Sequence, residues 1–312
     1  MKNCPIMTRI KENYESRSRI LLTRRTPVII RLDGKAFHTY TRSLNKPFDE
    51  GLIEDMQRTA AYLCENIQNV KCAYVQSDEI SLLLTDYDNL QSESWFDYNI
   101  QKMTSISASL ATAKFNQLRL LRELKESNFE MSVGDIGYQT LANFDSRVFN
   151  IPKEEVSNYF LARQKDAVKN SINMLAQSLY THGKPNSELY GKNSDQMQEM
   201  CFQKGHNWND LHFSKKRGSF IIKNTYVNDE LCKVYPNYII GIKEDFNKLE
   251  FYPKNCREDI TEDICRRYIP IYEEGSGYRD NFENIKIEKI RTKWEVVETP
   301  LRFNEQIFKQ WL

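Results

Sequence analysis

The sequence predicts an α+β protein of the ferredoxin-like class, in which the elements follow one another as βαββαβ. Two observations carry this prediction. Apolar runs of strand length precede or flank short polar motifs at residues 28–34 and 73–84, and long stretches with helical periodicity follow each of them. The resulting order is strand, helix, strand, strand, helix, strand, which is the split βαβ arrangement. In that arrangement the first strand and the later hairpin lie side by side.

The first predicted strand starts with residues 28–30, an apolar run suited to burial on both faces of a sheet. Asp33 and Gly34 then end the strand. Gly34 has no Cβ, which lets the backbone approach a ligand closely. Successive N–H groups of residues 35–38 could point at an anion, and the side chain of Lys35 adds positive charge. This motif therefore predicts an anion site at the end of the first strand.

A turn at residues 44–49 leads into the first helix. Asp49 is expected to cap the N-terminus of that helix, because a carboxylate there accepts hydrogen bonds from free backbone N–H groups. The apolar positions that follow repeat at helical spacing and form the buried stripe, which consists of Leu52, Ile53, Met56 and Ala60.

A hairpin is predicted next, with strands at residues 73–76 and 80–84 and with Ser77, Asp78 and Glu79 at its turn. If these strands share a sheet with the first one, Asp33 and Asp78 end neighbouring strands, roughly 5 Å apart. Two such carboxylates can hold two divalent cations about 3.5–4 Å apart, the clamp used for in-line displacement at phosphorus. Either motif alone is most often an ordinary turn. Their joint occurrence favours a metal site.

The second half of the fold contains two further helices and a strand. A helix is expected at residues 95–125 and a fourth strand at 141–152, in which Arg147 is a candidate ligand for phosphate. The helix at residues 153–180 has an apolar stripe and an opposite polar face. That polar face consists of Arg163, Asp166, Asn170 and Asn173. Such a face is usually solvated, but Arg and Asn side chains also form hydrogen bonds with phosphates and with the edges of bases.

The composition is that of a globular protein with a sizeable core: 312 residues, 40% of them hydrophobic. The formal net charge is only +1, so a nucleic-acid partner would need local basic patches, such as residues 17–25 and 215–217. The seven cysteines form no C-x-x-C pair, which argues against a zinc site. Their odd number favours a reducing, cytoplasmic environment. No apolar run approaches the ~20 residues that a membrane span requires.

The βαββαβ order matches the palm of polymerases and nucleotidyl cyclases, here with flanking helices. We expect a palm-like domain at residues 1–226. Strand-like alternation at residues 237–243 and 285–297, among charges of both signs, predicts a C-terminal extension over residues 227–312. A shared fold does not by itself give a function.

Ordered motifs along residues 8–226 carry a more specific signal. They are RLDGKAFH, KPFD, QSDEIS, FDSRVF, RQKDAVKNS, GKNS, NWNDL and KKRG. In these motifs and in their order the chain resembles the tRNA-histidine guanylyltransferase family. It is similar above all to the guanylyltransferase-like branch of that family, whose members add nucleotides in the 3′-to-5′ direction and repair tRNA 5′ ends.

The resemblance implies a site for two Mg²⁺ ions and a nucleoside triphosphate. Asp33, the carbonyl of Gly34 and Asp78 would hold the metal ions, and Glu79 joins the two aspartates as a third catalytic candidate. The residues that would contact the nucleotide are Asp33, Gly34, Lys35, Ala36, Phe37, His38, Lys46, Ser77, Asp78 and Arg147.

The resemblance also implies the reaction, with tRNA, ATP and GTP or another nucleoside triphosphate as substrates. ATP first activates the 5′-monophosphate of the tRNA as an adenylylated end. The 3′-hydroxyl of the incoming nucleotide then attacks that phosphate. Both steps are in-line displacements in which metal ions neutralise charge on the attacking and leaving oxygens. A homo-oligomer, a tetramer, is implied as well.

One departure from the family concerns the choice of tRNA. The histidine-specific enzymes carry a His-Ile-Asn-Asn-type motif, and the equivalent here is VKNS at residues 168–171, with Val168 in place of the histidine. This departure favours template-dependent addition to the 5′ ends of several tRNAs. The alternative is a dedicated tRNA-histidine guanylyltransferase.

Two other classes of function are less favoured. A nucleotidyl cyclase of the GGDEF type would place two glycines before the Asp-Glu, where this chain has Gln76 and Ser77. A non-catalytic RNA-binding module would be expected to lose a metal carboxylate, whereas Asp33 and Asp78 are both present.

Overall fold

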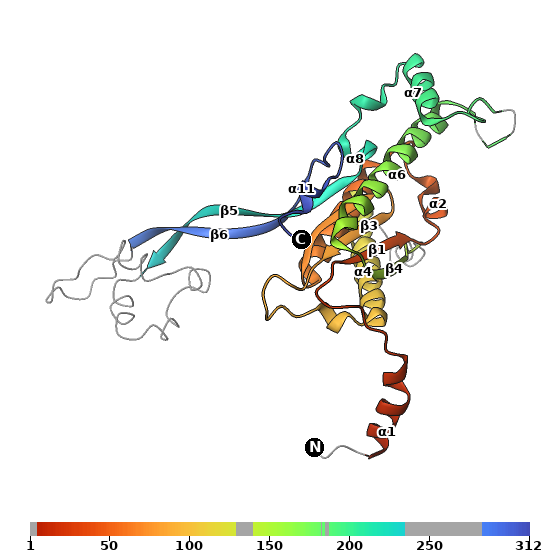
Figure 1. Cartoon of the computed structure of the whole chain (residues 1–312). Helices are drawn as coiled ribbons and strands as arrows, with labels where there is room; N and C mark the ends of the chain where they lie inside the picture. Colours follow the sequence, from red (N-terminus) through yellow and green to blue (C-terminus); the bar gives the residue numbers. More distant parts are fainter. Residues whose placement is uncertain (1–4, 129–139, 182, 185–186, 235–282) are drawn as a thin grey trace. The chain divides into compact units, whose positions relative to one another are not determined.

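The computed structural model describes residues 5–128, 140–181, 183–184, 187–234 and 283–312 (Figure 1). It contains a six-stranded sheet with the order β4-β1-β3-β2-β5-β6. The strands are β1 (Val28–Gly34), β2 (Val70–Gln76), β3 (Glu79–Leu84), β4 (Phe144–Asn150), β5 (Ser219–Val234) and β6 (Glu283–Val297). β1 runs antiparallel to β3 and β4, and β2 runs antiparallel to β3 and β5.

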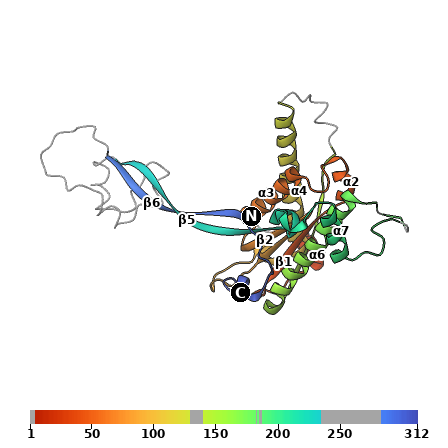
Figure 2. The same ribbon diagram turned by 90° about the horizontal axis from the view of Figure 1, so that it is seen from above.

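Helices cover both faces of this sheet. The α-helices are α1 (Pro5–Asn13), α2 (Phe37–Tyr40), α3 (Glu50–Asn66), α4 (Ile100–Glu126), α6 (Lys153–Leu179), α7 (Ser194–Gln203), α8 (Phe213–Lys216) and α11 (Glu305–Phe308). Short 3₁₀ turns lie at Glu15–Ser18, Thr41–Ser43, Trp95–Tyr98 and Trp208–Asp210. α3 and α4 lie on one side of the sheet and α6 on the other (Figure 2). Among the described residues, no helix is long and apolar enough to cross a membrane.

The mixed class of helices and antiparallel sheet is confirmed. β1, α3, β2, β3, α4 and β4 follow one another along the chain, and α6 comes after them. The finer assignment to a polymerase- or cyclase-type palm stays a prediction.

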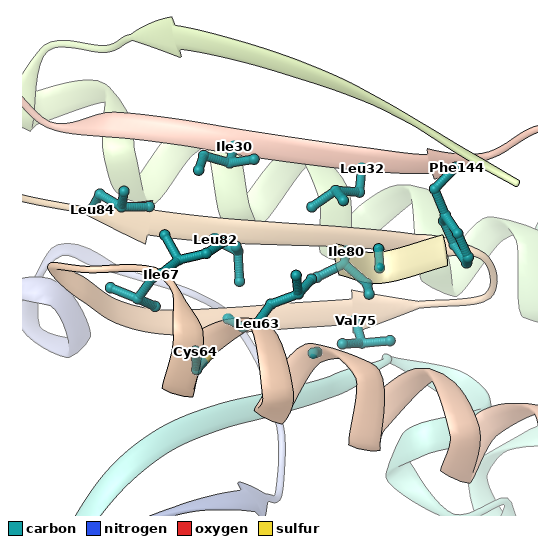
Figure 3. Close-up of a cluster of buried hydrophobic side chains, with 14 of the residues drawn as sticks. Ile30, Leu32, Leu63, Cys64, Ile67, Val75, Ile80, Leu82, Leu84 and Phe144 are labelled. Atoms are coloured by element: carbon teal, nitrogen blue, oxygen red, sulfur yellow. The ribbon is translucent and has the colours of Figure 1, made fainter. Parts of the chain in front are cut away.

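Successive side chains of β1 point to opposite faces of the sheet and differ in polarity. Ile30 and Leu32 are fully buried in the apolar cluster shared with α3 and α4, part of which Figure 3 shows. Ile29 packs in a second apolar cluster, which includes residues of α6. Arg31 and Asp33 share the face of Ile29, because successive side chains of a strand alternate. β1 therefore presents two charged side chains on its α6 side.

Several predicted bounds and caps agree with the structure. The Asp49 carboxylate caps α3 as predicted, since its Oδ1 accepts a hydrogen bond from the Leu52 N–H at 2.7 Å. β4 lies within the predicted strand 141–152, and the predicted strand 285–297 lies within β6. The predicted strand 237–243 falls outside the described residues.

One predicted helix starts later than expected. The helix expected at residues 95–125 begins at Ile100, because residues 95–98 form a 3₁₀ turn instead. Phe96, Asp97 and Tyr98 in this turn have φ angles of 51°, 52° and 52°, which no right-handed helix allows. Asn99 then caps α4.

A buried ion-pair network ties α3 to α4. Asp55 of α3 is fully buried. Its Oδ2 lies 3.2 Å from Arg119 Nη1 and 3.0 Å from Arg122 Nε, and its Oδ1 lies 2.8 Å from Arg122 Nη2. A carboxylate removed from water requires such partners. The network therefore fixes how the two helices pack against each other beneath the sheet.

The chain divides into two compact units. They are Met1–Lys223 together with Trp294–Leu312, and Asn224–Lys293. Within the first unit, the C-terminal segment packs on α6, where the ring of Phe308 stacks on Phe160 with 4.9 Å between centroids. The predicted division into residues 1–226 and 227–312 stays a prediction, and the last residues of the chain group with the first unit.

Candidate active site

A cavity of about 600 Å³ lies where the loop after β1, the β2–β3 turn and α6 come together. It is lined by most of the residues predicted to contact a nucleotide: Gly34, Ala36, Phe37, His38, Lys46, Ser77 and Asp78. It is also lined by residues that were not predicted as ligands, among them Asn45, Gln76, Gln177 and Lys215. The volume is in the range of small-molecule sites, so the predicted motifs converge on one cavity of suitable size.

The loop after β1 is tightly packed around Gly34. A Cβ at this position would lie 2.2 Å from Cδ2 of Phe37, so glycine is required. The Phe37 ring is buried and lies 5.2 Å from the Phe144 ring. Ala36 adopts a left-handed φ of 55°. The Gly34 N–H donates to the carbonyl of Asp78 at 3.1 Å, which holds the loop against the hairpin turn.

One backbone donor of this loop is already used. The N–H of Lys35 donates to the carbonyl of Asn143 at 2.8 Å, so the predicted use of this N–H for an anion is wrong. The side chain of Lys35 is exposed and does not line the cavity. Residues 36–38 do line it, and their N–H groups are the ones left to meet an anion.

The two predicted metal-binding aspartates end neighbouring strands, as expected. Asp33 is paired in register with Glu79 of β3, and Asp78 directly precedes Glu79. Burial raises the pKa of Asp78, and the negative charge of Asp33 acts in the same direction. Two carboxylates close enough to repel each other are a donor set that fits a divalent cation, because the cation relieves the repulsion.

The rest of the coordination would have to come from other oxygens. The described residues contain no group of three or more His, Cys, Asp or Glu side chains that could hold a metal ion. Mg²⁺ needs no such group, since it is usually bound through one or two carboxylates together with waters and substrate phosphates. Asp33 Oδ2 lies 3.6 Å from Arg31 Nη2 and 3.9 Å from Arg147 Nη2. Both distances exceed a hydrogen bond, so neither arginine occupies this carboxylate fully.

Glu79 lies beside this pair but does not line the cavity. Its side chain is only 6% exposed. Oε2 accepts hydrogen bonds from Arg31 Nη2 at 2.6 Å and from Arg163 Nη1 at 3.2 Å. Burial raises the pKa of Glu79, while the two arginines lower it. Arg31 was not among the predicted site residues, although its position two residues before Asp33 places both on one face of β1.

The two remaining predicted ligands lie in different places. Lys46 lines the cavity, where its Nζ donates to the carbonyl of Thr41 at 2.9 Å. Arg147 is 57% exposed on β4, 3.6 Å from Asp145 Oδ1 and near Asp33. It does not line the cavity, so any phosphate that it binds would lie outside the cavity and near Asp33.

The polar face predicted for α6 is only partly solvated. Arg163 binds Glu79, and Asn170 lines the cavity. Ser171 is buried: its Oγ accepts a hydrogen bond from Trp208 Nε1 at 2.9 Å, and its one proton has two acceptors in reach, the carbonyls of Val168 at 2.8 Å and Lys216 at 3.1 Å. The VKNS segment therefore faces the cavity and the protein interior rather than only solvent.

Some residues of the predicted basic clusters have partners within the protein. Arg24 Nε lies 3.1 Å from Oδ2 of Asp86, a fully buried carboxylate. Lys215 Nζ lies 2.7 Å from Glu50 Oε1 at the edge of the cavity. Arg24 thus stabilises the fold, while Lys215 lines the cavity with its charge paired to Glu50.

Comparisons with known proteins identify the family. A family model described as tRNA(His) guanylyltransferase matches residues 7–152. The tRNA(His) guanylyltransferase of Debaryomyces hansenii is 28% identical over 221 residues, which cover 67% of this chain and 78% of the relative. That of Schizosaccharomyces pombe is 27% identical over 222 residues, which cover 68% and 78%.

Two solved structures are more similar in sequence than these two relatives. A bacterial tRNA(His) guanylyltransferase-like protein in complex with ATP is 46% identical, with a TM-score of 0.61 over 70% of this chain and 88% of the other. A complex of such a protein with GTP is 44% identical, with a TM-score of 0.59 over 72% and 86%. The chain therefore belongs to the tRNA(His) guanylyltransferase family of nucleotidyltransferases.

Proposed function

We propose that this protein adds a nucleotide to the 5′ end of tRNA in the 3′-to-5′ direction. One observation carries the proposal: the loop after β1, Lys46 and Asp78 of the hairpin turn line one cavity. Asp33 does not line it but directly precedes the lining residue Gly34 and pairs in register with Glu79. A nucleoside triphosphate bound next to a carboxylate pair is what phosphoryl transfer requires. The related bacterial complexes with ATP and with GTP support a nucleotide as the occupant.

Asp33, the carbonyl of Gly34 and Asp78 would hold two Mg²⁺ ions. When bound, such ions neutralise the charge that develops on the attacking and leaving oxygens of an in-line displacement. The proposal includes the palm-type fold, in which this pair of strand ends carries the metal site.

The cavity residues bind and orient the triphosphate. Lys46 supplies a positive charge, and residues 36–38 line the same space, where their N–H groups would bind phosphate oxygens. Gly34 keeps the loop close to the hairpin turn, because its N–H donates a hydrogen bond to the carbonyl of Asp78. Its lack of a Cβ also allows the Phe37 ring to pack against it. The triphosphate would thus be held in the cavity, and the tRNA 5′ end would approach near Arg147, which lies outside it.

The reaction has two displacements. An oxygen of the tRNA 5′-monophosphate attacks the α-phosphorus of ATP, and pyrophosphate leaves. The 3′-oxygen of the incoming nucleotide then attacks the tRNA 5′-phosphorus, and AMP leaves. The incoming nucleotide therefore keeps its triphosphate at the new 5′ end.

Two candidates remain for the choice of tRNA. The names of the curated relatives favour a dedicated tRNA(His) guanylyltransferase. A specific observation favours template-dependent addition to several tRNAs: Val168 replaces the histidine of the recognition motif, and Asn170 of the same segment lines the cavity. In that case the opposite strand of the acceptor stem would select the nucleotide by Watson–Crick pairing.

Varying the template base separates these candidates. The substrates are 5′-monophosphorylated tRNAs that lack their first nucleotide and differ only in the base opposite the gap, incubated with Mg²⁺, ATP and all four nucleoside triphosphates. Template-dependent addition inserts the complementary nucleotide in each tRNA. A dedicated enzyme inserts guanosine regardless of the template or extends tRNA(His) alone, and no extension of any tRNA would overturn the proposal as a whole.

Two further expectations belong to this proposal. A homo-tetramer and a cytoplasmic location would agree with the resemblance of the chain to its family. Size-exclusion chromatography with light scattering tests the first, and fractionation of the source cells tests the second.

A further inference from the structure

A partly buried charged cluster lies between β1, β3 and α6, outside the cavity. Glu79 is at its centre, and every oxygen of its carboxylate has a protein donor. Oε2 accepts from Arg31 and Arg163, and Oε1 accepts from Ser81 Oγ at 3.4 Å. The hydroxyls of Ser81 and Tyr159 are in turn 2.8 Å apart. The lone pairs of Glu79 are therefore directed at side chains of the protein.

The charges of this cluster explain why a carboxylate is needed there. Arg31 and Arg163 both approach the same oxygen of Glu79, and Arg31 Nη2 also lies 3.6 Å from Asp33 Oδ2. Two guanidinium groups so close together repel each other unless an anion lies between them. Glu79 offsets one of the two positive charges, so the three side chains together keep a net charge of about +1.

We propose that Glu79 is a positioning residue, which holds Arg163 and Arg31 in place, Arg31 beside Asp33, so that they meet a phosphate of the substrate, and that it does not itself bind metal. The inference rests on the proposed function. Guanidinium groups bind phosphate oxygens through two parallel hydrogen bonds. Donors that are held in place before the substrate arrives need no rearrangement during the reaction.

A magnesium titration separates the positioning role from metal ligation. Glu79→Gln keeps the shape of the side chain and removes its charge. We expect kcat/KM for nucleotide addition to fall about 10- to 100-fold, as for displaced catalytic groups. The Mg²⁺ concentration that gives half-maximal activity should stay at its wild-type value. A large increase in that concentration would show that Glu79 is a metal ligand and would overturn the proposal, as would wild-type activity.

A double variant tests whether Glu79 acts through Arg163. If it does, Glu79→Gln lowers kcat/KM less in an Arg163→Met background than in the wild type, because coupled residues are not additive. If Glu79→Gln lowers kcat/KM by the same factor in the Arg163→Met background as in the wild type, the proposal is contradicted. Glu54→Gln is the matched control, since Glu54 also pairs with an arginine, Arg122 at 2.9 Å, but on an exposed surface of α3. It should keep wild-type activity.

Ligand binding measured without metal ions shows which substrate phosphate the two arginines contact. It also tests this inference independently of the proposed function. Dissociation constants are measured in EDTA for ATP and for tRNA with and without a 5′-phosphate. Glu79→Gln should weaken binding of the ligand whose phosphate the arginines meet, and unchanged constants for both ligands would overturn the inference. This result does not depend on turnover, so it stands even if the wild type extends no tRNA. If Glu79→Gln fails to fold, Arg163→Met alone should show the same weakened binding.

Discussion

The carboxylates of Asp33 and Asp78 lie in different surroundings, although both belong to neighbouring strand ends. Asp33 is partly exposed and flanked by Arg31 and Arg147. Burial, followed by repulsion from Asp33, raises the pKa of Asp78. A carboxyl group with a raised pKa in the folded state favours folding only when protonated, so its contribution is lost as the pH rises through that pKa. At neutral pH, an ionised Asp78 therefore does not stabilise the fold, and its presence is better explained by function.

Replacing Asp78 with Asn should abolish nucleotide addition and leave the thermal unfolding midpoint unchanged or slightly higher, because an ionised group that is partly desolvated is removed. Extension of labelled tRNA and differential scanning calorimetry measure the two effects. Asp97→Asn is a suitable control, since Asp97 forms an exposed pair with Arg19. Near-normal turnover in Asp78→Asn would contradict the assignment of Asp78 to the metal site.

The loop after β1 offers a matched pair of substitutions with opposite expectations. Gly34→Ala should weaken ATP binding and destabilise the fold, because the new Cβ would lie 2.2 Å from Cδ2 of Phe37. Ala36→Gly should change the free energy of unfolding by no more than about 1 kcal/mol, since glycine tolerates the left-handed φ that Ala36 adopts. Urea denaturation and calorimetric titration with ATP provide both values. Wild-type ATP affinity in Gly34→Ala would exclude this loop from the nucleotide site.

Among the elements, α3 and α4 depend on a charged contact as well as on apolar packing. Asp55 is fully buried and bonded to Arg119 and Arg122. Removing one partner of a buried ion pair leaves charge without compensation, which is more costly than losing an exposed pair. The contact lies on the face of the sheet opposite α6 and contributes no residue to the cavity. Its loss should therefore lower stability without changing the chemistry.

Asp55→Ala should lower the free energy of unfolding by about 3–5 kcal/mol, the usual cost of breaking a buried pair. Glu54→Gln on the same helix should change it by no more than about 0.5 kcal/mol, because the Glu54 side chain is exposed and its pair is screened. Denaturant unfolding of both variants gives the comparison. Similar losses in the two variants would show that burial of Asp55 does not set the stability of the α3–α4 contact.

At the scale of the whole molecule, the chain contains two compact units, and the first is formed by both ends of the sequence. Residues 294–312 pack in the first unit through aromatic contacts such as Phe308 on Phe160. β5 and β6, each of which contains residues of both units, are neighbours in the sheet. A short connection between them is therefore geometrically possible.

Replacing Asn224–Lys293 by a short Gly-Ser turn should leave the first unit folded, with ATP affinity close to that of the full chain, because the cavity is lined entirely by residues of that unit. Circular dichroism, thermal unfolding and ATP titration test this. A shortened protein that does not unfold cooperatively would show that the first unit depends on residues 224–293.

The sequence predicted those features that depend on short stretches of chain. Asp49 as a cap, Gly34 at the end of β1 and the hairpin around Asp78 all have local signals. The turn at residues 95–98 had none, because its left-handed residues are not glycines. The contacts of Glu79 could not be predicted either, since Arg163 is distant in the sequence and meets Glu79 only when α6 packs on the sheet.

The direction of addition can be measured with GTP labelled on its γ-phosphate. The substrate is a 5′-monophosphorylated tRNA that lacks its first nucleotide and has cytosine opposite the gap, with Mg²⁺ and unlabelled ATP. If the 3′-oxygen of GTP attacks the activated tRNA, the triphosphate stays on the new 5′ end and the label enters the RNA. We expect labelled RNA with the wild-type protein and none with Asp78→Asn. RNA that lengthens without label, its γ-phosphate released in pyrophosphate, would contradict 3′-to-5′ addition.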